Sequence, residues 1–212
     1  MHPFFFSGIR QMTAGLLFLL FFLFTGKAEI PSFKEAGYLI MMAILMFVLS
    51  NGFTTWAMKY LNSGLGAILG AIFPLFIAII EWAIGSKNQL NKISVIGLLL
   101  GFIGVAIIFY HHLEDFLDKG FRIGIFFSLS ASIFWSFGTV ITARTHLALN
   151  RYYSLGWQMF LSGIIMLIYC YITHHFTPLN QIPLKAWLYL AYMVSFGSII
   201  AFGAFVYTLH HL

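Results

Sequence analysis

Residues 4–24 read FFFSGIRQMTAGLLFLLFFLF, and residues 152–172 read YYSLGWQMFLSGIIMLIYCYI. The two stretches match at a shift of 148 positions, with aromatic and aliphatic residues replacing one another. One polar position and two glycines coincide in the two copies: Arg10 with Gln158, Gly8 with Gly156, and Gly15 with Gly163. The match predicts that this part of the chain is duplicated.

A second match extends the duplication. At a shift of 151, residues 34–61 match residues 185–212. Membrane units that repeat with an odd number of spans between them are inverted in the membrane, and inverted repeats form the framework of many secondary transporters. The sequence therefore predicts two inverted membrane repeats. The identical pairs at this shift are Lys34 and Lys185, Tyr38 and Tyr189, Leu39 and Leu190, Met42 and Met193, Gly52 and Gly203, and Leu61 and Leu212.

The composition excludes a soluble protein. Hydrophobic residues make up 61% of the chain and charged residues 8%, whereas soluble domains carry about 25% charged residues. The apolar runs reach the roughly 20 residues that a helix needs to cross a bilayer, and they lack the ten-residue alternation of barrel strands. The fold class is therefore an all-α integral membrane protein. Its seven expected spans are residues 4–24, 37–60, 64–85, 93–110, 121–143, 153–173 and 187–208.

Lysine and arginine in the short loops predict the orientation. The loops after the first, third and fifth spans hold six of these residues, against four in the other loops. Because positive residues stay on the cytoplasmic side, the N-terminus is expected outside and the C-terminus inside a cytoplasmic membrane. The lipid bilayer is thus a partner. The net charge of +5 forms no clustered basic face, so a nucleic-acid partner is not expected.

The polar segment HHLEDFLDKGFR, residues 111–122, separates the two copies. It holds three acids and two bases between apolar runs, and it is the clearest break in composition along the chain. We therefore assign a first repeat to residues 1–112 and a second repeat to residues 120–212.

Several stretches, in order, resemble the drug/metabolite transporter superfamily, and in particular its EamA-type permeases. The block SGLGAILGAIFPLFIAIIEW at 63–82 and the block IGLLLGFIGVAII at 96–108 carry much of the resemblance. Single Gly-rich apolar helices are common, but the order of the blocks and the repeat make chance similarity improbable. The other contributing residues are Pro3, Arg10, Ala14 and Gly15, Trp135, and Gln158 with Gly163.

The resemblance implies a ten-helix fold built from two inverted repeats of five helices. Against that plan, this chain is expected to begin at the second helix and to end after the eighth. The family moves small organic metabolites, amino acids or drug-like solutes by alternating access, more often as exporters. It tends to carry a Glu where this chain has Ser86, so a role of that Glu is not transferred.

Four polar residues inside the expected spans are candidates for a substrate path. Arg10 either reaches the interface or faces a polar cavity, because an unpaired charge in a membrane costs several kcal/mol. Gln158 is its repeat equivalent, and it either lines a shared central site or bonds a neighbouring helix. Asn51 has the same two interpretations. Glu81 is a candidate for proton coupling or for binding an amine, or it is solvated near the cytoplasmic end of its span.

Aromatic residues and one proline complete the candidates. Trp56, Trp135 and Tyr207 are substrate-path candidates, although Trp56 and Tyr207 lie near span ends, where aromatics often anchor a protein at the lipid interface. Pro74 interrupts its span and is the hinge candidate, since broken helices mark transporter sites.

Other functions find less support in the sequence. Adjacent His pairs at 111–112, 174–175 and 210–211 are poorly spaced for chelation, so no metal site and no cofactor are expected. Motifs of zinc, serine or phosphate-binding enzymes are absent, so the chain is not expected to be an enzyme. A seven-helix receptor or sensor remains the alternative, although a retinal receptor would need a lysine in its last span. Further open alternatives are an inactive partial transporter, a homodimer, and coupling to protons or to a counter-substrate.

Overall fold

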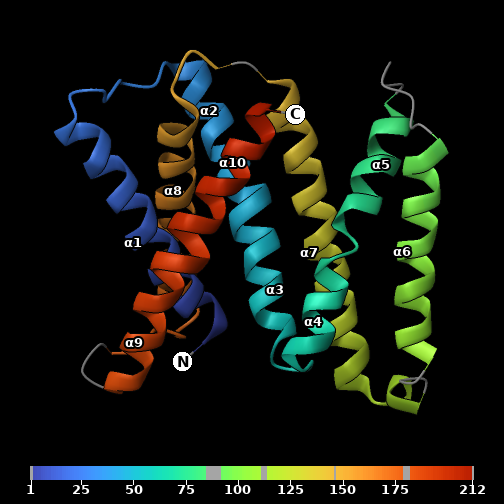
Figure 1. The fold of residues 1–212 in the computed structure, drawn as a ribbon. Coiled ribbons are helices and arrows are strands. Elements are labelled where there is room, and N and C mark those ends of the chain that lie inside the picture. Colours follow the sequence, from blue (N-terminus) through green and yellow to red (C-terminus); the bar gives the residue numbers. More distant parts are fainter. Residues whose placement is uncertain (1, 85–91, 111–113, 146, 179–181, 212) are drawn as a thin grey trace. The chain divides into compact units, whose positions relative to one another are not determined.

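The computed structural model describes residues 2–84, 92–110, 114–145, 147–178 and 182–211 (Figure 1). Every regular element in these ranges is helical, which confirms the expected all-α membrane protein. Six helical runs in the described ranges are long and apolar enough to cross a membrane. They are Pro3–Phe24, Phe33–Ala57, Ser63–Ala83, Lys119–Arg144, Arg151–Ile172 and Leu184–Thr208.

The fourth expected span, residues 93–110, is a helix with a shorter apolar part. Helix α6 runs from Lys92 to Tyr110, and the described apolar stretch within it is Ser94–Ile107. Its crossing of the membrane stays a prediction, as does the ten-helix plan. The expected loop at residues 85–91 lies outside the described residues.

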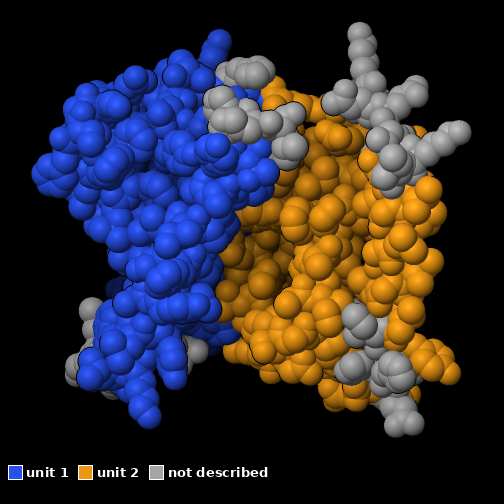
Figure 2. Space-filling view, in the orientation of Figure 1, with its two compact units in different colours: residues 1–48, 145–212 blue, residues 49–144 orange. Residues whose placement is uncertain are grey.

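The chain forms two compact units (Figure 2). Unit 1 combines the two ends of the chain, Met1–Val48 and Thr145–Leu212, whereas unit 2 is the continuous middle, Leu49–Arg144. These units are defined by which residues pack together, so they do not test the predicted boundary between the two sequence repeats at residues 111–122. Unit 1 holds α1 (Pro3–Phe24), α2 (Phe33–Met42), the first part of η1 (Ala43–Asn51), α8 (Arg151–Ile172), α9 (Leu184–Tyr192), η4 (Met193–Ile200) and α10 (Ala201–His211).

Side-chain caps fix several helix starts. The hydroxyl of Ser32 accepts a hydrogen bond from the backbone N–H of Glu35, and the carboxylate of Glu35 accepts one from the N–H of Ser32. This reciprocal pair satisfies two backbone donors that would otherwise be left free at the start of α2. At α8 the cap is one-sided: the side-chain oxygen of Asn150 accepts hydrogen bonds from the N–H groups of Tyr152 and Tyr153. The result is that both α2 and α8 begin at a polar residue directly before an apolar run.

Helices α1 and α8 pack side by side and antiparallel (Figure 1). A Cβ placed on Gly8 would meet Leu167, whereas one placed on Gly15 would meet the backbone of Phe160 and Gly156. The backbones approach so closely because glycine has no side chain at the crossing, as is usual for helix contacts in membranes. The glycines that coincide in the two predicted repeats therefore lie where α1 and α8 contact one another.

Each repeat contains a π-helix at the same place. Helix η1 covers Ala43–Asn51, and η4 covers Met193–Ile200. The shift of 151 that aligns the repeats carries Met193, the first residue of η4, onto Met42, the residue before η1. π-Helices are rare and usually a single turn long, and they are frequent at functional sites. The corresponding positions of the two π-helices indicate that both belong to the predicted repeat.

Unit 2 is built around α7, Lys119–Arg144. Helices α3, α4 and α5 pack against it, and α6 contacts α5. A small apolar core of Ala57, Leu61, Leu65, Leu69 and Phe121 joins α3, α4 and α7. The further bounds are Gly52–Ala57 for α3, Ser63–Gly70 for α4, Phe73–Ala83 for α5 and Glu114–Leu117 for the short 3₁₀ helix η2.

Candidate functional site

Helix α1 buries two polar side chains in unit 1. Ser7 and Gln11 are each 0% exposed. They lie four residues apart, so they occupy one face of the helix. The hydroxyl of Ser7 and both polar atoms of the Gln11 amide have no hydrogen-bond partner among the described residues. Such groups carry a penalty of about 1–3 kcal/mol each unless something outside the chain completes their hydrogen bonds.

Helix α8 contributes a polar row of its own. Ser154, Gln158 and Ser162 follow at intervals of four residues, and all three are buried. The hydroxyl of Ser162 donates to the carbonyl of Met159 at 2.8 Å, whereas that of Ser154 finds no partner in the described chain. Gln158, expected from the repeat, is 6% exposed. It therefore lies inside unit 1 and not on its surface.

The π-helix η4 adds a third polar position. Helix η4 is in contact with α1. Ser198, on the buried side of η4, is 0% exposed. Its hydroxyl lacks a hydrogen-bond partner within the described residues. Three neighbouring helices of unit 1 thus bury polar groups whose hydrogen bonds are incomplete.

The other predicted residues of unit 1 lie elsewhere. Arg10 is partly buried in α1, on a face about 100° around the helix from Gln11, since successive residues are that far apart. Tyr207, in α10, is 58% exposed, as an aromatic anchor at the lipid interface would be. Of the predicted path residues in unit 1, only Gln158 is fully buried.

In unit 2 the helical span that contains Pro74, the predicted hinge, is interrupted. Helix α4 ends at Gly70, and α5 begins at Phe73 with Pro74 in its first turn. Proline lacks the N–H that would continue the helix and clashes with the preceding turn. The expectation that Pro74 interrupts this span agrees with the observed bounds, although its role in motion stays a proposal.

Two serines of α7 stabilise the break. The Ser132 hydroxyl lies 3.3 Å from the carbonyl oxygen of Leu69, and the Ser136 hydroxyl lies 2.9 Å from that of Phe73. Each hydroxyl is also within hydrogen-bond distance of the carbonyl four residues earlier in α7. Inside a membrane, broken helices are tolerated where neighbouring serines satisfy the backbone groups at the break. Ser132 and Ser136 do this for α4 and α5 whenever their single hydroxyl hydrogen points to the carbonyl of Leu69 or Phe73 and not to that of α7.

The remaining predicted residues of unit 2 lie on four different elements, η1, α3, α5 and α7. The Lys59 ammonium lies 4.7 Å from the centre of a Trp56 ring, a cation–π contact typical of a membrane interface. The carbonyls of Asn51 and Trp135 accept hydrogen bonds from Thr55 and Thr139. Glu81 is partly exposed near the end of α5.

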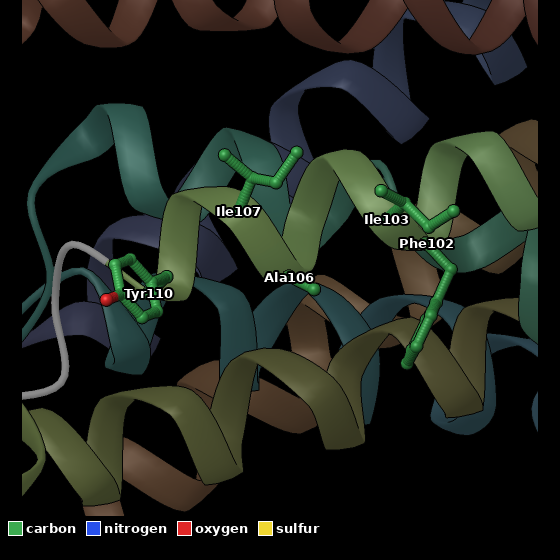
Figure 3. A pocket seen from close by; sticks show the side chains of 5 residues that line it. All are labelled: Phe102, Ile103, Ala106, Ile107 and Tyr110. Carbon is green, nitrogen blue, oxygen red and sulfur yellow. The ribbon is translucent and has the colours of Figure 1, made fainter.

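A hollow of about 340 Å³ lies on α6 (Figure 3). Its lining is aliphatic and aromatic, and the phenol oxygen of Tyr110 is the one polar side-chain atom shown there. Such a lining suits lipid chains and offers no set of hydrogen bonds to a polar solute. The lining residues are Phe102, Ile103, Ala106, Ile107 and Tyr110.

The histidine pairs form no described metal cluster. Within the described residues no group of three or more potential ligands comes together. His175 stacks on His2 with 4.3 Å between ring centres. The pair at 111–112 lies outside the described residues, as do the side chains of the pair at 210–211.

The comparison with known protein families matches two segments of the chain. The model of the EamA-like transporter family matches residues 1–110 and 122–212. The chain belongs to the EamA-like transporter family. The resemblance inferred from the sequence is thereby confirmed, and the chain is a multi-pass membrane protein of this family.

Relatives of this EamA-like chain carry transporter names. An uncharacterized transporter of Synechocystis is 28% identical over 97% of the chain, and the uncharacterized inner membrane transporter YedA of Escherichia coli is 27% identical over 99%. The uncharacterized transporter YoaV of Bacillus subtilis is 24% identical over 89%. The chain spans 66% of the length of the first two relatives and 62% of YoaV.

Sequence reasoning missed several polar residues of the EamA-like chain that the structure buries. Gln11 is next to Arg10 in the chain, and only the charged residue of the two was chosen as a candidate. Ser7, Ser132, Ser136 and Ser198 looked like the small residues that any membrane helix contains. The available signal was an interval of four between polar residues within apolar spans, as in Ser7 with Gln11 and Ser132 with Ser136.

Proposed function

We propose that the chain is a secondary transporter of small organic metabolites, amino acids or drug-like solutes in the cytoplasmic membrane. The observation that carries the proposal is that one transporter-family model matches the chain twice, at residues 1–110 and 122–212. Two copies of one membrane unit provide the two halves that alternating access requires. Export is the direction implied by the family resemblance.

Two features of the units support alternating access. Helices α1 and α8, the first matched pair of the repeats, are antiparallel, as inverted copies would be. The span Ser63–Ala83 is broken before Pro74, and the second span of each repeat contains a π-helix. Irregular helices of this kind supply both binding groups and places to bend in transporters. We propose Pro74 as a hinge and the ten-helix inverted repeat as the parent architecture.

The buried polar rows support solute binding. An apolar helix has no reason to bury an unpaired amide unless a polar group meets it. The candidates retained for the substrate path are Arg10, Asn51, Trp56, Glu81, Trp135, Gln158 and Tyr207. Coupling to protons or to a counter-substrate and assembly as a homodimer are parts of this proposal that need their own measurements.

Exchange across a membrane tests the function. The full chain, purified in detergent and reconstituted into liposomes preloaded with unlabelled L-alanine, L-phenylalanine or benzamide, is expected to accumulate the labelled form of at least one of them. Protein-free liposomes provide the baseline. If none of the three accumulates above that baseline while the protein is folded and inserted, the transport proposal is wrong.

Cysteine labelling tests the orientation. The native Cys170 is buried, so it gives little background. Glu29→Cys is expected to resist a membrane-impermeant maleimide in intact cells, because the loop after the first span faces the cytoplasm. Thr177→Cys is expected to react, since its loop faces outward. The reverse labelling pattern would invert the proposed topology, and labelling of both positions would exclude it.

A further inference from the structure

We propose that Ser7, Gln11 and Ser198 form a solute-contact site in unit 1 that binds an uncharged hydrogen-bonding group, such as a carboxamide, a hydroxyl or a protonated carboxyl. The site rests on the transport function proposed above and specifies which part of the solute unit 1 recognises. None of its three residues was among the candidates derived from the sequence.

The first argument is the incomplete hydrogen bonding of Gln11. Its side chain is 0% exposed, and both amide atoms lack a partner among the described residues. A primary amide can donate two hydrogen bonds and accept two. Burying it without any of them carries a large desolvation penalty. The amide therefore needs a polar group from outside the described residues, and an ordered water or part of a solute can supply it.

The second argument is that two more buried hydroxyls lie on the same pair of contacting helices. Ser7 precedes Gln11 by one helical turn, so the two side chains follow one another on the same face of α1. Ser198 is a buried residue of η4, and η4 is in contact with α1. Both hydroxyls are 0% exposed and unpartnered within the described chain. Each can donate and accept, as can the amide.

The third argument is the local backbone. Ser198 lies within a π-helix, in which the N–H of Ala201 donates to the carbonyl of Phe196 five residues earlier. This irregular geometry is retained in proteins mostly at functional sites. It is independent evidence that this stretch does more than pack, since a regular helix would bury its apolar residues equally well.

The charges nearby select the class of ligand. Neither α1, α8 nor η4 contains an Asp or Glu, so a cationic group would find no counter-charge on these helices. Arg10 lies on another face of α1, about 100° from Gln11. An unpaired charge of either sign is costly at this depth. An amide and two hydroxyls instead match the mixed donors and acceptors of a neutral polar group.

The variant Gln11→Leu tests the site, because it removes the amide and keeps a similar volume. Removal of an unpaired buried amide is not expected to lower the melting temperature of the protein. In the liposome exchange assay, however, the KM of the transported solute is expected to rise at least tenfold. Ser7→Ala and Ser198→Ala are expected to raise KM less, since each removes a single hydroxyl. Thr13→Val, on the opposite side of α1, is the matched control and should leave KM unchanged.

A binding measurement separates this site from the transport function. Benzamide, benzoate and benzylammonium share one ring and differ in charge, so their effects on the melting temperature of the purified chain can be compared. Benzamide is expected to raise the melting temperature of the wild type but not of Gln11→Leu, and benzylammonium to raise neither. Benzamide stabilisation without exchange of any solute would overturn the transport function and support the site.

Two results would overturn the site itself. Exchange with the same KM in wild type and Gln11→Leu, together with equal responses to benzamide, would show that an ordered water completes the amide. A melting temperature that falls in Gln11→Leu while KM is unchanged would show that Gln11 is structural. Stabilisation by benzylammonium that depends on Gln11 would contradict the inferred ligand class.

Discussion

Gly163→Ala is expected to destabilise the protein by about 3 kcal/mol, and Gly163→Leu to prevent unit 1 from folding. A Cβ at this position would stand 2.6 Å from the Cα of Met12 and would also contact its backbone nitrogen. Gly15→Ala is expected to have a similar effect, since its Cβ would lie 2.7 Å from the carbonyl oxygen of Gly156. Backbone atoms cannot turn aside as a flexible side chain can, so α1 and α8 would have to separate.

The matched control is an alanine at Gly101 in α6. No described atom lies within 4 Å of a Cβ built there. Because alanine favours a helix over glycine, Gly101→Ala is expected to stabilise the protein by about 0.5–1 kcal/mol or to leave it unchanged. Thermal unfolding in detergent, followed by size-exclusion chromatography, measures both variants. Equal midpoints for Gly163→Ala and Gly101→Ala would show that α1 and α8 are not in close contact.

Much of this packing could be predicted from the repeat. The glycines that coincide at the shift of 148, Gly8 with Gly156 and Gly15 with Gly163, are those that bring α1 and α8 together. The apolar runs also located the helices within a few residues, because length and composition are enough to define membrane helices. The break before Pro74 could also be predicted from the sequence, since proline cannot continue a helix.

The π-helices could not be predicted. The η1 segment AILMFVLSN contains no proline or glycine that would mark an irregular backbone. A π-helix has no signature in its local sequence, and the contacts around it come from distant parts of the chain, such as the edge-to-face contact of Phe47 with Phe202, whose ring centres are 5.2 Å apart. Their equivalence became visible only when the observed bounds were compared with the repeat.

The candidate site was predictable only in part. Arg10 and Gln158 were named because their repeat positions coincide, but the structure buries Gln158 fully and Arg10 only partly. The sequence did not indicate which face of α1 is buried, because apolar residues surround the helix on all sides. Gln11 therefore could not be distinguished from a polar residue that faces a headgroup or a loop. Burial and missing hydrogen-bond partners, both properties of the packed structure, identified it.

The double variant Ser132→Ala, Ser136→Ala is expected to destabilise unit 2 by about 1–2 kcal/mol. Each serine hydroxyl has one hydrogen, which it donates either to a carbonyl beside the break, that of Leu69 or that of Phe73, or to the carbonyl four residues earlier in α7. Hydrogen bonds between membrane helices average about 0.6 kcal/mol and reach about 1.7. Two such bonds of average strength give about 1.2 kcal/mol, which lies within the expected range.

Ser130→Ala is the control for this pair, since Ser130 lies on the same helix, two residues from Ser132 and about 200° around it. Thermal midpoints of the three proteins measure the stability. If the serines also hold the hinge at Pro74, the double variant is expected to change the maximal exchange rate in liposomes while KM stays constant, because the site proposed for the polar group of the solute, Ser7, Gln11 and Ser198, lies in unit 1. A changed KM would instead place these serines in the solute path, and unchanged stability and exchange would show that water satisfies the carbonyls equally well.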